Sequence, residues 1–102
     1  MASKAALEIH QLHQVDLTRV QKSKASTNAV RAFQILCKFP IASIADLQRQ
    51  LPDLGVPTLQ RAVDKLVTAN ILREATGKRR NRHWLYERYY DIITRDTKMP
   101  IG

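Results

Sequence analysis

The sequence predicts a mainly helical domain that carries one small β-hairpin, and three observations lead to this fold class. Residues 57–70 have the apolar spacing of an amphipathic helix. Residues 71–75 and 83–87 have the composition of two short strands, and the loop between them contains Gly77. Residues 4–24 contain neither glycine nor proline and consist largely of good helix formers. Helix, short helix, turn, helix and hairpin, in this order, are typical of a winged helix-turn-helix, which we expect here after a long N-terminal helix.

The 102 residues suffice for one domain with one core. We expect residues 26–95 to form this domain, residues 1–25 to form the N-terminal helix, and residues 96–102 to form a frayed tail. The apolar stripe of the N-terminal helix is thin, so we expect the helix to rest on one side of the domain or on a partner outside this chain. The stripe consists of Ala6, Ile9, His13, Leu17 and Val20.

The segment before the hairpin helix divides into a helix, a very short strand and a shorter helix. N-cap residues at 26–28 precede the first helix, which Pro40 ends. Ser43 is suited to cap the shorter helix, because its hydroxyl can accept a hydrogen bond from a free N–H of the first turn. The predicted segments are a helix over 29–38, a strand at 41–42 and a helix over 44–51.

Two residues set the ends of the helix over 57–70. Pro57 suits its first turn, because the N–H that proline lacks would have no partner there. Asn70 suits the left-handed position that ends the helix, a role more often filled by glycine. A last short helix is predicted over 89–95, after the hairpin.

The chain is strongly basic. Lysine and arginine total 17 against 9 acidic residues, which gives a net charge of +8 and a pI of about 10.2. This balance favours a polyanionic partner, most commonly nucleic acid, although many basic domains bind none. The single cysteine, Cys37, excludes an internal disulfide and is compatible with the reducing cytoplasm, where we expect the protein. No apolar run approaches the ~20 residues of a membrane span, so we expect no membrane partner.

The polar face of the helix over 57–70 has the residue types of a DNA-recognition helix. Glutamine and arginine can read base edges in a major groove, while threonine and lysine suit phosphates. A solvated face on any surface helix has the same composition, and this helix taken alone favours that simpler interpretation. Asp64 in the middle of the face counts further against tight phosphate contact. The candidate contacts are Thr58, Gln60, Arg61 and Lys65.

The hairpin loop, residues 76–82 and here called the basic loop, is the stronger electrostatic signal. It carries four cations and no acid. Such a loop could enter a minor groove or hold phosphates. It could equally be a solvated turn, or its arginines could pair with acids elsewhere. Alternation would put Arg80 and Arg82 on one face of the second hairpin strand, where they could form ion pairs with a neighbouring domain. The candidate contacts are Lys78, Arg79, Arg80 and Arg82.

Other residue patterns carry little chemistry. His10 and His13 are three residues apart, but zinc needs a third and a fourth ligand and no cysteine or carboxylate cluster completes the set, so we expect polar surface and no metal site. The aromatic residues of the second strand and after it are expected to pack in the core. No glycine-rich phosphate loop, carboxylate pair or nucleophile with a base is present in the sequence, so we expect no enzyme activity from this chain.

Three stretches before the basic loop, and the loop itself, closely resemble the C-terminal winged-helix domain of Fic-family proteins (filamentation induced by cyclic AMP). In that family a run of the form gIL.EiTGr.RnR.y.Y..Y..il closes the chain, and Tyr86 and Tyr89 stand at its two tyrosine positions. The resemblance covers residues 26–95 and is strongest over 56–93. The three stretches are Val56-Pro57-Thr58, Ala62-Val63-Asp64-Lys65-Leu66 and Asn70-Ile71-Leu72-Arg73-Glu74.

The resemblance implies a module of a protein AMP-transferase without its catalytic part. Fic enzymes transfer AMP from ATP to a protein hydroxyl through a motif of the type HxFx(D/E)GNGRxxR, which this sequence lacks. The inhibitory (S/T)xxxE(G/N) helix is absent from the sequence as well, so no catalytic residue is carried over. ATP and magnesium are expected only for the missing catalytic domain, and no cofactor is expected here. Residues 4–24 resemble the helix that joins the Fic core to this domain.

Two functions remain open at this point. The first is binding of double-stranded DNA by the helix from Pro57 and the basic loop. The second is protein interaction, in which the loop and the N-terminal helix dock on the Fic catalytic domain or its target, or form a homodimer.

Overall fold

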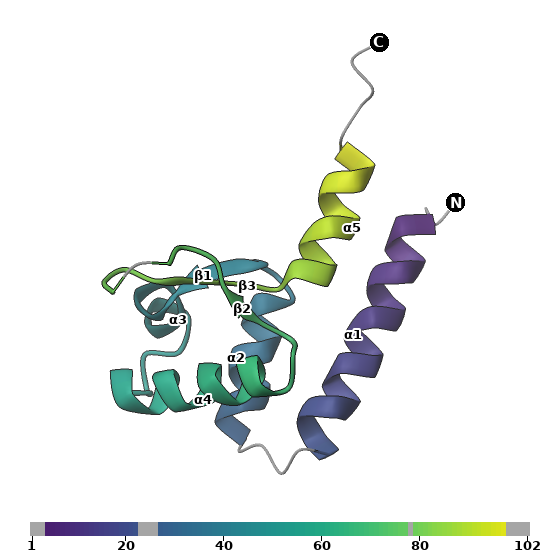
Figure 1. Cartoon of the computed structure of the whole chain (residues 1–102). Helices are drawn as coiled ribbons and strands as arrows, with labels where there is room; N and C mark the ends of the chain where they lie inside the picture. The colour runs from purple at the N-terminus through teal and green to yellow at the C-terminus, as the bar shows by residue number, and fades with distance from the viewer. Residues whose placement is uncertain (1–3, 23–26, 78, 98–102) are drawn as a thin grey trace.

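In a computed structural model of the protein, the described residues are 4–22, 27–77 and 79–97, the side chains of residues 96 and 97 apart. They form five α-helices and one three-stranded antiparallel sheet, which confirms the mainly helical class with a small β-hairpin (Figure 1). The helices are α1 (Lys4–Lys22), α2 (Thr27–Leu36), α3 (Ile44–Gln50), α4 (Val56–Thr68) and α5 (Glu87–Thr97), and the strands are β1 (Ile41–Ser43), β2 (Arg73–Glu74) and β3 (His83–Leu85).

The core lies where α2 and α4 pack against each other and against the sheet. Each helix contributes one apolar face, as its 3.6-residue periodicity requires. Leu36 of α2 and Leu59 of α4 have no exposed surface, and Trp84 of β3 is only 4% exposed. The inward face predicted for the helix from Pro57 is confirmed, with Leu59, Ala62, Val63 and Leu66 all buried.

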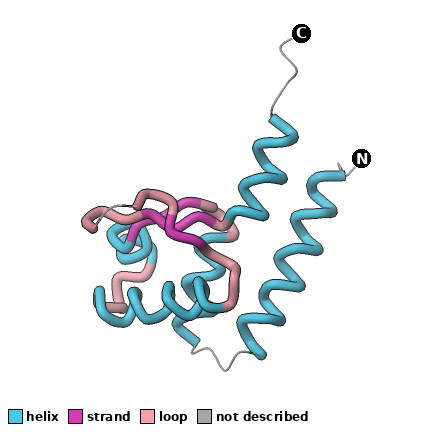
Figure 2. The backbone as a smooth tube through the Cα atoms, in the orientation of Figure 1, coloured by secondary structure: helices cyan, strands magenta, loops and turns pink. Residues whose placement is uncertain are grey.

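The sheet is small, and β3 is its central strand. β1 and β2 pair with β3 from either side, both antiparallel (Figure 2). In this register Trp84 lies opposite Ala42 and Glu74. The strand predicted at 41–42 is confirmed and extends to Ser43. The hairpin strands are shorter than predicted, because only residues 73–74 and 83–85 pair as strands.

Helices α1 and α5 lie side by side and extend beyond the part that holds the sheet, α3 and α4 (Figure 1). Val20 of α1 is buried, and Arg95 of α5 pairs with Glu8 of α1 at 2.6 Å. The thin stripe of α1 therefore has its partner within this chain. Of the five residues in the predicted stripe, Ala6 alone is exposed.

A buried carboxylate that the sequence analysis missed connects this helix pair to the end of α4. Asp16 has no exposed surface and accepts hydrogen bonds from Arg19 and Arg88 at 3.3 Å each. The same two guanidinium groups donate to the backbone carbonyls that follow α4, Arg19 to Ala69 at 2.6 Å and Arg88 to Asn70 at 3.1 Å. Buried charge is stable only when it is paired and hydrogen-bonded, and here the pairing also satisfies carbonyls that the helix end leaves free.

His13 is not the polar surface residue that we expected. Its ring lies edge-on to Tyr89 with centroids 4.6 Å apart, and 5.8 Å from the ring of Tyr86. Its Nε2 atom is buried and has no hydrogen-bond partner within the described ranges. Burial lowers the pKa of this imidazole, and the nearby Asp16 carboxylate only partly opposes that effect.

The boundaries of four helices differ from the predicted ones. α3 ends at Gln50 rather than at residue 51, and α4 covers Val56–Thr68 rather than 57–70. α2 covers Thr27–Leu36 rather than 29–38, so Thr27 lies inside the helix instead of capping it, while Ser26 lies outside the described residues. α5 begins at Glu87 rather than at residue 89, because only three residues of β3 pair before the chain turns. It ends at Thr97, so residues 96 and 97, assigned to the tail, continue the helix. Residues 98–102 lie outside the description.

Two predicted caps are confirmed. The Ser43 hydroxyl accepts from the Asp46 N–H at 3.1 Å, and the Asp46 carboxylate accepts from the Ser43 N–H at 2.9 Å, which is a complete capping box. Asn70 has a φ of 61°, in the left-handed region predicted for it. These two residues set the start of α3 and the end of α4.

Candidate nucleic-acid interface

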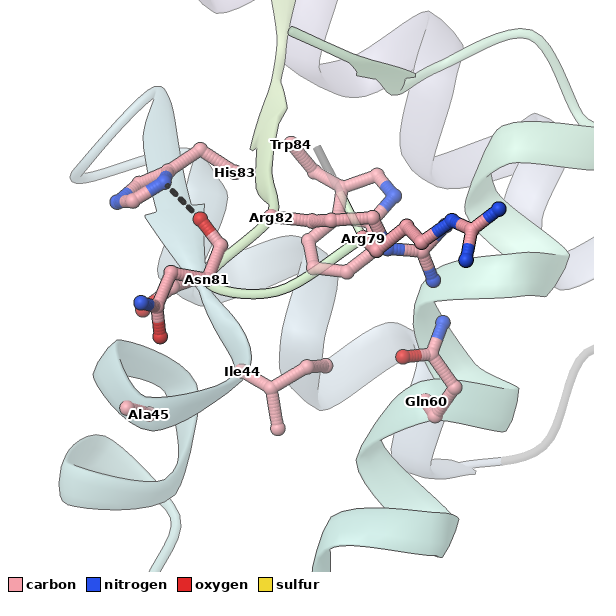
Figure 3. A pocket seen from close by; sticks show the side chains of 9 residues that line it. Ile44, Ala45, Gln60, Arg79, Asn81, Arg82, His83 and Trp84 are labelled. Carbon is pink, nitrogen blue, oxygen red and sulfur yellow. Dashed lines mark hydrogen bonds between the residues drawn. The ribbon is translucent and has the colours of Figure 1, made fainter. Parts of the chain in front are cut away.

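The basic loop leaves β2 and returns to β3 at the end of the molecule away from α1 and α5 (Figure 1). Gly77 (φ 64°) and Asn81 (φ 54°) both have left-handed backbone, which glycine and asparagine adopt at little cost. Below the loop, the Ala75 N–H donates to the His83 carbonyl at 2.8 Å. Nδ1 of His83 donates to the Asn81 carbonyl at 2.9 Å (Figure 3). The loop is thus tied on its returning side by its own backbone and by His83.

Arg82 lies over the ring of Trp84, with the guanidinium carbon 5.0 Å from the ring centroid. A guanidinium over an indole face is held by the negative charge density of the ring. The second hairpin strand, β3, begins only at His83, so the expectation that Arg80 and Arg82 alternate on one strand face is wrong. Arg80 is exposed, whereas the indole partly covers Arg82.

A groove of about 370 Å³ lies between the start of α3, α4 and the basic loop (Figure 3). Ser43 and Ile44 line it from the α3 side, Gln60 from α4, and Arg79 and Arg82 from the loop, with Trp84 also in its wall. The structure therefore brings three of the predicted contact residues, Gln60, Arg79 and Arg82, to one place.

The other predicted residues of α4 do not line this groove. Thr58 is half-buried, and Arg61 and Lys65 are exposed. Lys65 lines a separate hollow at the other end of α4, together with Asp64. Gln60 donates its side-chain amide to Asp64 at 2.9 Å, so the acid in mid-face orients a candidate base-reading residue. Lys78, the remaining candidate, lies outside the described residues.

The arginines divide sharply between paired and unpaired. All ten arginines of the sequence are described, and six of them take part in ion pairs with acids of this chain. None of the four others, within the part of the chain that the structure describes, lies in an ion pair. Those six are Arg19, Arg31, Arg49, Arg73, Arg88 and Arg95, and the unpaired four are Arg61, Arg79, Arg80 and Arg82.

All four unpaired arginines lie on α4 or on the basic loop. Exposed ion pairs are weak, but a cation already beside a carboxylate attracts a phosphate less than a free one does. Among the arginines, the positive charge still open to an outside anion is therefore concentrated on α4 and the basic loop. The alternative that the loop arginines pair with acids elsewhere is not met within residues 4–22, 27–77 and 79–97.

Three functional features escaped sequence reasoning. Trp84 was expected in the core, and it is buried there, yet it also forms part of the groove wall under Arg82. Glu74 accepts hydrogen bonds from the first residues of the basic loop. Asp16 is the buried centre of a four-residue network. An isolated acid in a helical pattern gives no sequence signal for such a role, because its partners lie far along the chain.

Side chains that could support other chemistry are scarce. Burial raises the pKa of the Cys37 thiol to about 12, so it is not activated as a nucleophile. Among the described residues, no three of histidine, cysteine, aspartate and glutamate come close enough together to hold a metal ion. In the same part of the chain, no helix has both the length and the apolar character needed to cross a membrane.

Comparison with protein-family models, with curated proteins and with solved structures gave no match to this chain.

Proposed function

We propose that this chain is a winged-helix module that binds double-stranded DNA, with α4 in the major groove and the basic loop on the sugar–phosphate backbone. The observation that carries the proposal is the division of the arginines, since each of the four without an ion pair lies on α4 or on the loop. Counterion release from phosphates drives such binding, and unpaired arginines are the groups that displace counterions.

The order of the elements supports the winged-helix assignment. Helix α2, strand β1, helices α3 and α4, and the hairpin β2–β3 follow one another, with β1 adding a third strand beside β3. In this arrangement α4 takes the place of a recognition helix and the basic loop that of the wing. Gln60 is suited to a base edge, since its amide offers a donor and an acceptor.

The test is a titration of a fluorescent duplex with the protein at several salt concentrations. We expect log K to fall with log salt with a slope of about −0.9 for each phosphate contact. The triple substitution Arg79→Ala, Arg80→Ala, Arg82→Ala should remove most of the affinity and make the slope smaller by about 3.

A matched variant removes the same charge elsewhere. Arg31→Ala, Arg95→Ala and Lys38→Ala take three positive charges from surfaces away from the groove, and two of these three cations already pair with acids. We expect this variant to keep most of the affinity and the salt slope. Equal losses in the two triple variants would refute a specific interface, and no binding by the unmodified chain would refute the proposal.

A second function, protein interaction, is favoured by one observation. Leu7 and Val15 of α1 are 57% and 58% exposed, although the same helix packs against α5 and α2 by its other residues. On this proposal α1 contacts a Fic-type catalytic domain, its target, or a second copy of this chain. Leu7→Gln with Val15→Gln should abolish concentration-dependent association in sedimentation and leave duplex affinity unchanged. A monomer at all concentrations, with or without the catalytic domain, would refute it.

The Fic relationship itself is part of the proposal and rests on the run from Asn70 to Ile93. A catalytic Fic motif encoded immediately upstream in the same reading frame is the observation that we expect. Its absence from the surrounding coding sequence would remove the AMP-transferase parent while leaving the DNA-binding proposal standing.

A further inference from the structure

Glu74 is an acid at the base of the most basic segment of the chain. By charge alone it is out of place, because a carboxylate beside phosphate-binding arginines reduces their attraction for a polyanion. It lies in β2, two residues before the basic loop begins. Its unfavourable effect on anion binding therefore points to a structural role for the side chain.

The contacts of its side chain define that role. One oxygen, Oε2, accepts hydrogen bonds from the backbone N–H of Thr76 at 2.5 Å and of Gly77 at 2.6 Å. The same oxygen accepts from the Thr76 hydroxyl at 3.2 Å. Hydrogen bonds from N–H groups to a carboxylate are among the stronger ones in proteins. They hold the pKa of Glu74 below its ordinary value, with the Gly77 N–H as the largest cause, so the group is charged at neutral pH.

These bonds fix the first turn of the basic loop. Gly77 has left-handed backbone, and its N–H and that of Thr76 converge on one anion. The Thr76 hydroxyl in turn accepts from the His83 N–H at 3.4 Å, which ties the outgoing half of the loop to the returning half. Glu74 also lies directly opposite Trp84 in the sheet register.

Each side of the loop thus meets one member of this cross-strand pair. The outgoing side is bound by the Glu74 carboxylate, and the returning side carries Arg82 over Trp84. A loop with four cations repels itself, and fixing it in advance spares the ordering cost that binding would otherwise pay.

We propose that Glu74 is a positioning residue for DNA binding, whose carboxylate holds the basic loop so that Arg79, Arg80 and Arg82 meet the phosphates together. This inference rests on the proposed function. It makes an uncommon prediction, namely that removing a negative charge from the interface weakens binding to a polyanion.

The experiment compares three variants by duplex titration at several salt concentrations. Glu74→Ala should lower the affinity about tenfold and make the salt slope smaller, although every arginine is still present. Glu74→Gln keeps an oxygen acceptor and should recover part of the loss, to about threefold. Glu87→Gln removes the same charge from an acid that pairs with Arg73 and does not touch the loop, so its affinity should stay the same or rise slightly.

A second readout needs no DNA. In ¹H–¹⁵N spectra, the amide protons of Thr76 and Gly77 should lie downfield and be protected from exchange in the unmodified chain. Both properties should be lost in Glu74→Ala, while amides of α2 and α4 stay protected and so show that the fold is retained.

The outcomes are distinct. If Glu74→Ala binds duplex as tightly as the unmodified chain, or more tightly as charge alone predicts, the inference is wrong. Amides of Thr76 and Gly77 that are indifferent to the substitution would also overturn it. If the unmodified chain binds no duplex but these amides respond, the proposed function fails, and Glu74 is shown to hold the loop for another purpose.

Discussion

The hydroxyl of Tyr86 donates a 2.6 Å hydrogen bond to Oδ2 of Asp16, seventy residues earlier, and neither side chain has any exposed surface. The other carboxylate oxygen of Asp16 faces Arg19 and Arg88. The burial and this hydrogen bond together raise the pKa of the Tyr86 hydroxyl far above its ordinary value, so it stays a donor at any physiological pH. One contact therefore joins α1 to the point where the sheet passes into α5.

Replacing Tyr86 by phenylalanine should destabilise the protein by about 2 kcal/mol, because one oxygen of a buried carboxylate loses its donor. Unfolding in urea, followed by circular dichroism, measures the change. Tyr90→Phe is the matched control, since Tyr90 is 37% exposed, and its effect should stay within about 0.5 kcal/mol. Equal effects of the two substitutions would contradict the role given to the Asp16 contact.

The stability of the protein should fall as the pH drops below 6.5, the ordinary pKa of histidine, because of His13. A histidine with a pKa lowered by folding binds fewer protons in the folded chain than in the unfolded one, so acid favours the unfolded state. For one such group the slope cannot exceed about 1.4 kcal/mol per pH unit.

His13→Phe should flatten this dependence, since a phenyl ring can take the place of the imidazole among Phe33, Tyr86 and Tyr89. His10→Gln, one turn earlier on the exposed side of α1, should keep most of the dependence, because the charge of His10 is the smallest of the causes that shift the pKa of His13. Urea unfolding at several pH values from about 7.5 to about 5, a range that includes the ordinary pKa of histidine, distinguishes the two variants. A dependence that persists in His13→Phe would assign it to another group.

Asn70 has a left-handed conformation at the end of α4, so the effect of a substitution on stability should depend on the backbone preference of the new residue rather than on its side-chain contacts. Asn70→Gly should be neutral or slightly stabilising, whereas Asn70→Ala should cost about 1 kcal/mol, because a Cβ is disfavoured at positive φ. Thermal or urea unfolding measures both. A glycine variant that is less stable than the alanine variant would show that the asparagine side chain itself matters.

Cys37 should react slowly with a disulfide reagent such as DTNB in the folded protein. Its thiol pKa is raised to about 12 by burial, and only the thiolate attacks. The unfolded chain in guanidinium chloride is the reference, and there the reaction should be orders of magnitude faster at pH 8, near the ordinary thiol pKa. Comparable rates in the two states would mean that the segment after α2 opens readily.

Arg82→Lys should weaken duplex binding about two- to fivefold while leaving the salt slope unchanged, because lysine keeps the charge but not the planar stack on Trp84. Anisotropy titrations at two salt concentrations give both quantities. Arg95→Lys, in an ion pair on the far helix pair, should alter neither. A changed slope in Arg82→Lys would mean that lysine loses the phosphate contact itself.

Local signals in the sequence predicted the mainly helical class with its small hairpin, and the ends of two helices. The Ser43 cap and the left-handed Asn70 depend on residues within three or four positions, so their chemistry is readable from the sequence. Gln60, Arg79 and Arg82 were among the candidate contacts taken from the sequence, but the sequence did not predict a groove and could not show that these residues share one hollow with Trp84.

Most of the missed features depend on contacts between distant segments. Asp16 meets Tyr86 and Arg88 only after the chain has folded, so its neighbours in sequence carry no trace of the network. The early start of α5 likewise follows from where β3 stops pairing, which propensity does not indicate. Glu74 is close to its partners in sequence, but its role requires the backbone of the loop to be known.

Because α1 and α5 pair in antiparallel fashion, the distance between them can report which surface of the protein a ligand binds. Glu8 and Arg95 meet at the end of this pair farthest from the groove (Figure 1). Spin labels placed beside these two positions would report the separation of the helices without touching the basic loop. Duplex that seats on α4 alone would leave the measured label distance unchanged, whereas a protein partner that takes hold of α1 would alter it, and one spectrum would then tell the two kinds of ligand apart.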